Sequence, residues 1–171
     1  KNISSNLQIE QELFYDEGTG FSANRKMKAI IDPESDGYNF CFVPGEDIAS
    51  NIAALRFDPS WMGGITVTNL LICVVYENDV NLSYNITDVR SNGCAIGERL
   101  VFLKSDPQIT VRLTKTEKIK KVQIRADIVN NIDDEDIVKA ARLEVVKNSL
   151  IYRLCRKIYR KVKWLMRKCI G

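Results

Sequence analysis

Apolar and polar residues alternate in short stretches through the first three quarters of the chain. The alternation is clearest in Gln108–Leu113 and Val122–Ile128, in which every second residue is apolar. A period of two places the apolar side chains on one face of an extended strand, which is typical of antiparallel sheets with one face in water. We expect strands at Glu10–Tyr15, Met27–Ile31, Tyr38–Val43, Ala53–Phe57, Ile65–Tyr76, Arg99–Lys104, Gln108–Leu113 and Lys118–Val129.

Turn-forming residues separate these stretches. Asp32-Pro33, Asp58-Pro59 and Asp106-Pro107 each follow or precede a predicted strand, and Gly63-Gly64 precedes another. Short strands at this spacing, with no pattern of helix length between them, predict a mainly β fold. We expect an antiparallel β-sandwich of jelly-roll type that occupies residues 1–131.

The pattern changes after Asn131. The acidic residues Asp133–Asp136 are favourable at the positive end of a helix dipole, and apolar residues from Ile137 to Leu165 then recur about every 3.6 residues. This predicts a C-terminal basic amphipathic α-helix, either continuous or broken near Asn148-Ser149. We assign residues 132–171 to this helical unit, a basic tail or a linker toward a further domain; that this domain is catalytic is implied only by the family resemblance given below.

The charge of the chain is divided between these two units. Residues 147–171 hold nine Lys or Arg and no acidic residue, a net charge of +9, whereas the rest of the chain has a net charge of −6. Such a division predicts that the helical unit faces an anionic or acidic neighbour.

Three partners could use the basic helix. It could pack on the sandwich or on a neighbouring domain, it could lie on an anionic membrane surface with its aromatic residues at the interface, or it could bind nucleic acid. The first two are favoured, and no nucleic-acid partner is expected, because the β domain is acidic and has no recognisable reading motif. The predicted membrane or partner contacts are Arg153, Arg156, Lys157, Arg160, Lys161, Lys163, Trp164, Arg167 and Lys168.

The residues needed for common catalytic systems are missing. The chain has no histidine, which excludes Ser-His-Asp and Cys-His nucleophile systems and removes the commonest metal ligand. Its five cysteines are far apart, without a C-x-x-C pair, and fit neither a zinc site nor a disulfide framework. We therefore predict no catalytic residue and no cofactor, and free cysteines favour a reducing compartment.

Two loop features resemble ligand sites in part. Gly18-Thr-Gly20 lacks the following residues of a phosphate or dinucleotide loop and indicates a tight turn. Asp16, Glu17 and Asp88 could hold a structural calcium ion, but no D-x-D-x-D-G loop is present. We interpret these acids as turn residues and predict no metal site.

Aromatic residues in loops and at strand ends are the candidates for binding. A sugar ring can stack its apolar C–H face on an aromatic side chain. Trp61 lies between an Asp-Pro turn and Gly63-Gly64 and is the strongest candidate. Tyr15, Phe21 and Tyr84 are further candidates, and the alternative is that these aromatic residues close the ends of the sandwich core.

The location of the protein is inferred from missing signals. The N-terminus has no secretory pattern, and the longest apolar run, Leu70–Tyr76, is too short to span a bilayer. We therefore expect a cytoplasmic protein, at the inner face of the plasma membrane if its helix binds lipid. Because the chain begins at Lys1 without an initiator methionine, we also expect it to be part of a longer protein.

Four stretches resemble one protein family in their order along the chain. They are Gln11–Ser22 (QELFYDEGTGFS), Ala54–Pro59 (ALRFDP), Ser105–Ile109 (SDPQI) and Glu144–Leu154 (EVVKNSLIYRL). Together they are similar to an accessory β-sandwich domain of large bacterial glycosyltransferases, including rhamnan and O-antigen biosynthesis proteins.

The resemblance implies a non-catalytic module beside a nucleotide-sugar-dependent transferase domain. It implies carbohydrate binding or scaffolding within the assembly of a cell-surface polysaccharide, with the adjacent transferase domain and the polysaccharide as partners. The alternative is a purely structural domain that docks the enzyme at the membrane and binds no sugar. Neither reading gives this chain an activity of its own.

Overall fold

The protein is mainly β with a C-terminal helix. The computed structural model describes residues 11–30, 39–46, 48, 51–115, 117–130, 135–148, 154 and 157–159. Its elements are β1 (Glu12–Asp16), β2 (Lys26–Ile30), β3 (Phe40–Phe42), β4 (Ala54–Phe57), β5 (Ile65–Tyr76), β6 (Asn81–Asn85), β7 (Arg90–Ser91), β8 (Cys94–Ile96), β9 (Arg99–Phe102), β10 (Ile109–Arg112), β11 (Ile119–Asn130) and α1 (Glu135–Asn148). Each strand predicted from the alternation is present, whereas β6, β7 and β8 were not predicted.

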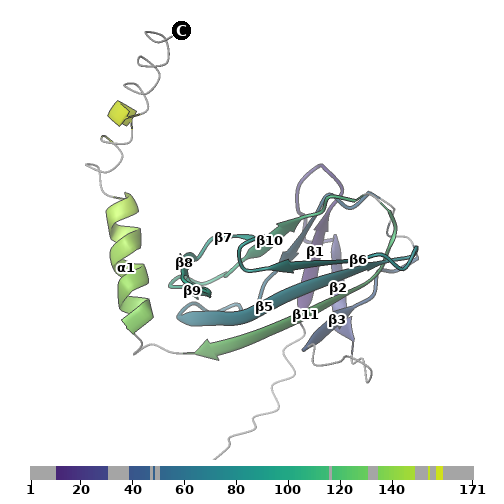
Figure 1. Cartoon of the computed structure of the whole chain (residues 1–171), viewed down its shortest axis with the longest axis horizontal. Helices are drawn as coiled ribbons and strands as arrows, with labels where there is room; N and C mark the ends of the chain where they lie inside the picture. The colour runs from purple at the N-terminus through teal and green to yellow at the C-terminus, as the bar shows by residue number, and fades with distance from the viewer. Residues whose placement is uncertain are drawn as a thin grey trace, which may run out of the picture.

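The strands form one antiparallel hydrogen-bonded path in the order β7-β10-β4-β1-β2-β3-β11-β5-β9-β8, and β6 pairs with β5 (Figure 1). The antiparallel, mainly β part of the prediction is therefore confirmed. Strand β2 pairs with both β1 and β3 and so joins the two halves of the path. The long strands β5 and β11 pair along almost their whole length in the second half.

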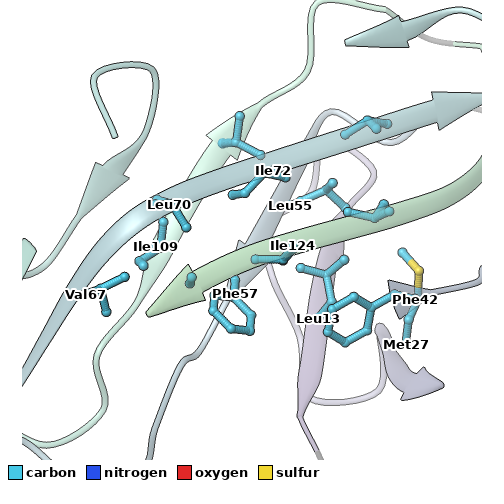
Figure 2. Packing of buried hydrophobic residues seen from close by; sticks show 14 of the residues in the cluster. Leu13, Met27, Phe42, Leu55, Phe57, Val67, Leu70, Ile72, Ile109 and Ile124 are labelled. Carbon is cyan, nitrogen blue, oxygen red and sulfur yellow. The ribbon is translucent and has the colours of Figure 1, made fainter. Parts of the chain in front are cut away.

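Both halves of the path contribute to one hydrophobic core. Leu13, Leu55 and Ile109 come from β1, β4 and β10, and they cluster with Ile72 and Ile124 of β5 and β11 (Figure 2). These side chains are almost completely buried. Burying an aliphatic side chain of this size stabilises a fold by about 1.5–3 kcal/mol, so the cluster is the main source of stability for the sheet.

A β-bulge interrupts β5 at Asn69. Ile65 and Val67 face the core before it, and Leu70 and Ile72 face the core after it, so the inward positions change parity. The pairing with β11 skips a residue at the same place, and Asn69 has a φ of 51°. One extra residue in this strand lets both of its segments bury their apolar side chains.

Helix α1 begins at the acidic stretch, as the sequence predicts. Lys139 forms an ion pair with Glu135 one turn before it, with 3.3 Å between Nζ and Oε2. Ala140 is fully buried and packs against Cys94 and Val101, so the helix contacts β8 and β9. The amphipathic pattern beyond Asn148 falls almost entirely outside the described residues, and so does the predicted boundary at residue 131. Among the described residues, no helix is long and apolar enough to cross a membrane.

Candidate functional site

Strands β1, β4 and β10 lie side by side and carry one outward surface. Phe14, Arg56 and Thr110 are register partners across these strands. Their chain neighbours Leu13, Leu55 and Ile109 face the core, so alternation turns Phe14, Arg56 and Thr110 outward. Three of the four stretches that carry the family resemblance thus meet on neighbouring strands, although long segments separate them in the sequence.

Arg56 is fixed at the centre of this surface. Its Nε and Nη2 donate to Oδ1 and Oδ2 of Asp58 at 2.9 and 2.8 Å, which is a bidentate pair. Its guanidinium carbon lies 4.3 Å from the ring centroid of Phe14 and 5.4 Å from that of Phe21. The ion pair and the cation–π contacts hold the cation between the two aromatic rings.

The loop that follows β4 holds Trp61 exposed but anchors its backbone. The side chain of Trp61 is 73% exposed, while its carbonyl accepts a hydrogen bond from the N–H of Asp106 at 3.4 Å. The N–H of Gly64 donates to the carbonyl of Phe102 at 2.7 Å. At Gly63 an added Cβ would lie 2.4 Å from the carbonyl carbon of Lys104, so this loop packs directly on the segment before β10. Because the backbone is anchored, a ligand that covers the ring does not have to order the loop.

A hollow of about 210 Å³ lies beside Trp61. Its wall carries two aromatic side chains and several hydrogen-bonding groups, from the residues Gln11, Glu12, Phe14, Asp58, Ser60, Trp61 and Asp106. The floor is ordered, since Gln11 is buried and its Nε2 donates to the carbonyl of Pro59 at 3.5 Å.

The carboxylates around the hollow influence one another. Burial raises the pKa of Asp58 above its ordinary value, the hydrogen bonds and the charge of Arg56 oppose this rise, and the carboxylates of Asp106 and Glu12 add to it. Carboxylates accept hydrogen bonds from hydroxyl groups, and Gln11 and Ser60 add polar atoms. The arrangement suits a ligand with an apolar face and several hydroxyls.

The four aromatic residues predicted to bind sugar do not form one site. Trp61 lines the hollow, and Phe21 lies next to it through Arg56. Tyr15 and Tyr84 instead pack against the core cluster, where Tyr15 lies on the same side of β1 as Leu13. Tyr15 and Tyr84 therefore follow the alternative stated in the sequence analysis, in which aromatic residues close the core. Neither belongs to the surface around Trp61.

The acidic turn residues have local roles. Oδ1 of Asp16 accepts hydrogen bonds from the N–H groups of Gly18 and Gly20 at 2.8 and 2.7 Å, and Oδ2 of Asp88 accepts one from the N–H of Asn85 at 2.9 Å. Glu17 forms an ion pair with Arg25 at 3.3 Å. No group of three or more His, Cys, Asp or Glu that could hold a metal ion occurs in the part of the chain that the structure describes.

Most of the predicted helix contacts lie outside the described residues. Lys157 is described and is exposed. Those outside are Arg153, Arg156, Arg160, Lys161, Lys163, Trp164, Arg167 and Lys168.

The sequence prediction missed the polar part of the surface, Arg56 and Asp58 in particular. A signal was present, because Arg56 interrupts the apolar strand Ala54–Phe57 and Asp58 follows two positions later on the same face. What the pattern does not contain is the pairing of β1 with β4 and of β4 with β10, which brings these residues together.

Comparisons with known proteins identify no relative: no family model, no curated protein and no solved structure matches the chain.

Proposed function

We propose that this chain is a non-catalytic carbohydrate-binding module of a bacterial glycosyltransferase that builds cell-surface polysaccharide. In this proposal the two halves of the sheet are the layers of a jelly-roll sandwich, the chain resides in the cytoplasm, and the transferase domain is its neighbour. The observation that carries the binding role is Trp61, an exposed indole on an anchored loop above a polar hollow.

The chemistry around Trp61 supports a sugar ligand. An indole face removes the apolar side of a pyranose from water, while Asp58, Asp106 and Ser60 offer partners to its hydroxyls. The hollow of about 210 Å³ is smaller than the sites that enclose drug-sized ligands, which begin at about 300 Å³. It therefore suits one sugar unit of a longer glycan lying across the surface.

The test is a calorimetric titration of the full chain against a panel of neutral oligosaccharides containing rhamnose, mannose, galactose or glucose. We expect saturable binding to at least one member, and Trp61→Ala should weaken it about tenfold or more because the stacking surface is lost. Trp61→Phe should retain part of the affinity.

The matched control is Tyr159→Ala, which removes a similarly exposed aromatic ring, 64% exposed, from the helical part of the chain. This variant should bind the glycan as the parent does. A flat response to the whole panel, or equal affinities of the parent and Trp61→Ala, would show that this surface does not bind sugar.

A structural docking role is the second candidate, and the outward face of the helical part supports it. Leu143, Leu154 and Ile158 are 45, 60 and 55% exposed in the same part of the chain as the exposed Lys157. Exposed apolar residues near a basic residue suit an anionic membrane surface.

Sedimentation with vesicles distinguishes this candidate from sugar binding. If the helix docks on the membrane, the full chain should sediment with phosphatidylglycerol vesicles at low salt but not with phosphatidylcholine vesicles. Leu154→Asp combined with Ile158→Asp should abolish sedimentation, whereas Trp61→Ala should leave it unchanged. Equal sedimentation with both lipids would contradict the docking role.

A further inference from the structure

A second cavity lies on an edge of β5 where its pairing changes partner. Strand β11 occupies one edge of β5 along its length. On the other edge β9 pairs with residues 65–67 and β6 pairs with residues 71–75, so residues 68–70 lie between the two partners (Figure 1). This stretch contains the bulge residue Asn69, whose Nδ2 donates to Oδ2 of Asp127 at 2.6 Å.

The cavity in this gap measures about 580 Å³, within the range of about 300–1,000 Å³ that small-molecule sites occupy. Three segments line it: the bulge of β5, the end of β6 with the turn that follows, and the turn before β9 with the first residue of that strand. The lining residues are Thr68, Asn69, Leu70, Asn85, Ile86, Thr87, Glu98 and Arg99.

The turn after β6 is rigid and presents a donor. Oδ1 of Asn85 accepts hydrogen bonds from the N–H and the hydroxyl of Thr87 at 2.8 and 2.7 Å, and the N–H of Asn85 donates to Asp88. These bonds fix the amide of Asn85 with its oxygen used, which leaves its NH₂ group to donate to a ligand.

The start of β9 and the turn before it supply one charge of each sign, from Arg99 and Glu98 respectively. A guanidinium has five N–H donors in a planar fork, so Arg99 can serve several partners and still bind a carboxylate or phosphate. The carboxylate of Glu98 accepts hydrogen bonds from hydroxyls and repels a second anionic group on the ligand. Leu70 and Ile86 add a small apolar area.

From this lining we propose that the cavity is a second binding site, specific for a sugar unit that carries one anionic group. Arg99 and the NH₂ group of Asn85 bind the anion, Glu98 and the threonine hydroxyls bind the ring hydroxyls, and Leu70 and Ile86 contact the apolar face of the ring. The site shares no lining residue with the hollow beside Trp61, so it goes beyond the proposed function and does not depend on it.

Calorimetry on the full chain tests the site with defined probes. Glucuronate and galacturonate represent an acidic polysaccharide unit, and glucose 1-phosphate represents a sugar phosphate. Glucose has the ring and its hydroxyls without an anionic group, and inorganic phosphate has the anionic group without a ring. We expect a uronate or the sugar phosphate to bind saturably, with an affinity at least tenfold higher than that of glucose and of inorganic phosphate. Whichever of the two binds more tightly shows whether the natural ligand is an acidic polysaccharide unit or a sugar phosphate.

Variants assign the binding to this cavity. Arg99→Gln should weaken the acidic sugar at least tenfold, and Thr87→Val, which removes the hydroxyl that fixes Asn85, should weaken it severalfold. Arg112→Gln is the matched control, since it removes an exposed arginine of β10 that does not line the cavity. Arg112→Gln should bind as the parent does, and urea unfolding of each variant verifies that it is folded.

Three results would overturn the proposal, and two of them concern the probes: no binding of any acidic probe, or no acidic sugar that binds more tightly than both glucose and inorganic phosphate. An equal loss in Arg99→Gln and Arg112→Gln would also overturn it, because the effect would then be one of net charge. Loss of neutral-glycan binding in Trp61→Ala is a separate measurement, so failure at one site is distinguishable from failure at the other.

Discussion

At the scale of single residues, two buried phenols stand out in the core. Tyr76 is completely buried, and the hydroxyls of Tyr76 and Tyr84 have no hydrogen-bond partner among the described residues. An unsatisfied buried polar group costs about 1–3 kcal/mol of stability. The Tyr76 hydroxyl, whose neighbour among the polar side chains of the core is the Tyr84 phenol, therefore adds little to stability, while its ring contributes apolar area.

The variant Tyr76→Phe should be as stable as the parent at pH 7, or more stable by about 1 kcal/mol, because it removes an unsatisfied hydroxyl. Burial, and next the neighbouring Tyr84 phenol, raise the pKa of Tyr76 from 10.0 to about 12. Between pH 10 and about pH 12 the Tyr76 hydroxyl is deprotonated in the unfolded chain but still protonated in the folded protein. The parent should therefore lose stability as the pH rises from 10 to 12.

Urea unfolding at pH 7, 10 and 12 compares the parent with Tyr76→Phe and with the exposed control Tyr159→Phe. The alkaline loss should be smaller in Tyr76→Phe and unchanged in the control. The same loss in all three proteins would show that Tyr76 does not cause it.

Gly63 is required by the backbone beside it. Because a Cβ at this position would overlap the carbonyl carbon of Lys104, Gly63→Ala should cost about 2 kcal/mol or more in urea unfolding. Gly45→Ala is the matched control, since a Cβ there meets no atom within 4 Å. It should change stability by less than about 0.5 kcal/mol. Equal losses in the two variants would mean that the loop before β5 is not packed as described.

At the scale of elements, alternation predicted the strands with several apolar positions and missed those with few. Strand β6 presents only Leu82 and Tyr84 to the core, between exposed Asn and Ser residues, and β7 and β8 are two and three residues long. Strands this short are defined by their partners, because too few apolar positions repeat to form a pattern. Pairing over a long sequence separation is likewise not encoded in local spacing.

The candidate site was predictable to a similar extent. Trp61 was found because a tryptophan between two turn motifs is displayed on a loop. Tyr15 was placed in the site because it ends a strand, although its parity with Leu13 already pointed to the core. The place of Arg56 and Asp58 in the site follows only from the pairing of β4 with β1 and β10, which the local sequence does not show.

The bulge in β5 makes a prediction at this scale. Asn69 has a φ of 51°, a conformation that asparagine and glycine adopt and that β-branched residues avoid. Asn69→Val should therefore destabilise the protein by about 1–3 kcal/mol, while Asn69→Gly should cost less, since only the bond to Asp127 is lost. Urea unfolding of both variants measures the difference, and equal costs would contradict a strained position.

At the scale of the whole molecule, helix α1 is attached to the sheet through a small contact. Ala140 fits against Cys94 and Val101, and Sγ of Cys94 lies 3.7 Å from the carbonyl oxygen of Ala140. The helix therefore shields a cysteine, and Cys94 can report whether the helix is attached.

Ala140→Glu should detach the helix, because the packed position has no space for a charge and no partner for it. Cys94 should then react with a thiol reagent at least tenfold faster, as measured by mass spectrometry of the labelled peptides. Arg142→Glu, a charge change at an exposed helix position, is the control and should leave the rate unchanged. Slow labelling of Cys94 in Ala140→Glu would show that the helix does not protect it.

The order of the strands also has a consequence during synthesis. The surface around Trp61 needs β1, β4 and β10, which leave the ribosome in that order, and β10 ends at Arg112. A nascent chain that stops before Arg112 has exposed Trp61 but lacks the third strand of the scaffold beneath it. Display of the finished surface therefore requires translation beyond Arg112, and a product truncated before that residue would not compete for the ligand that we propose.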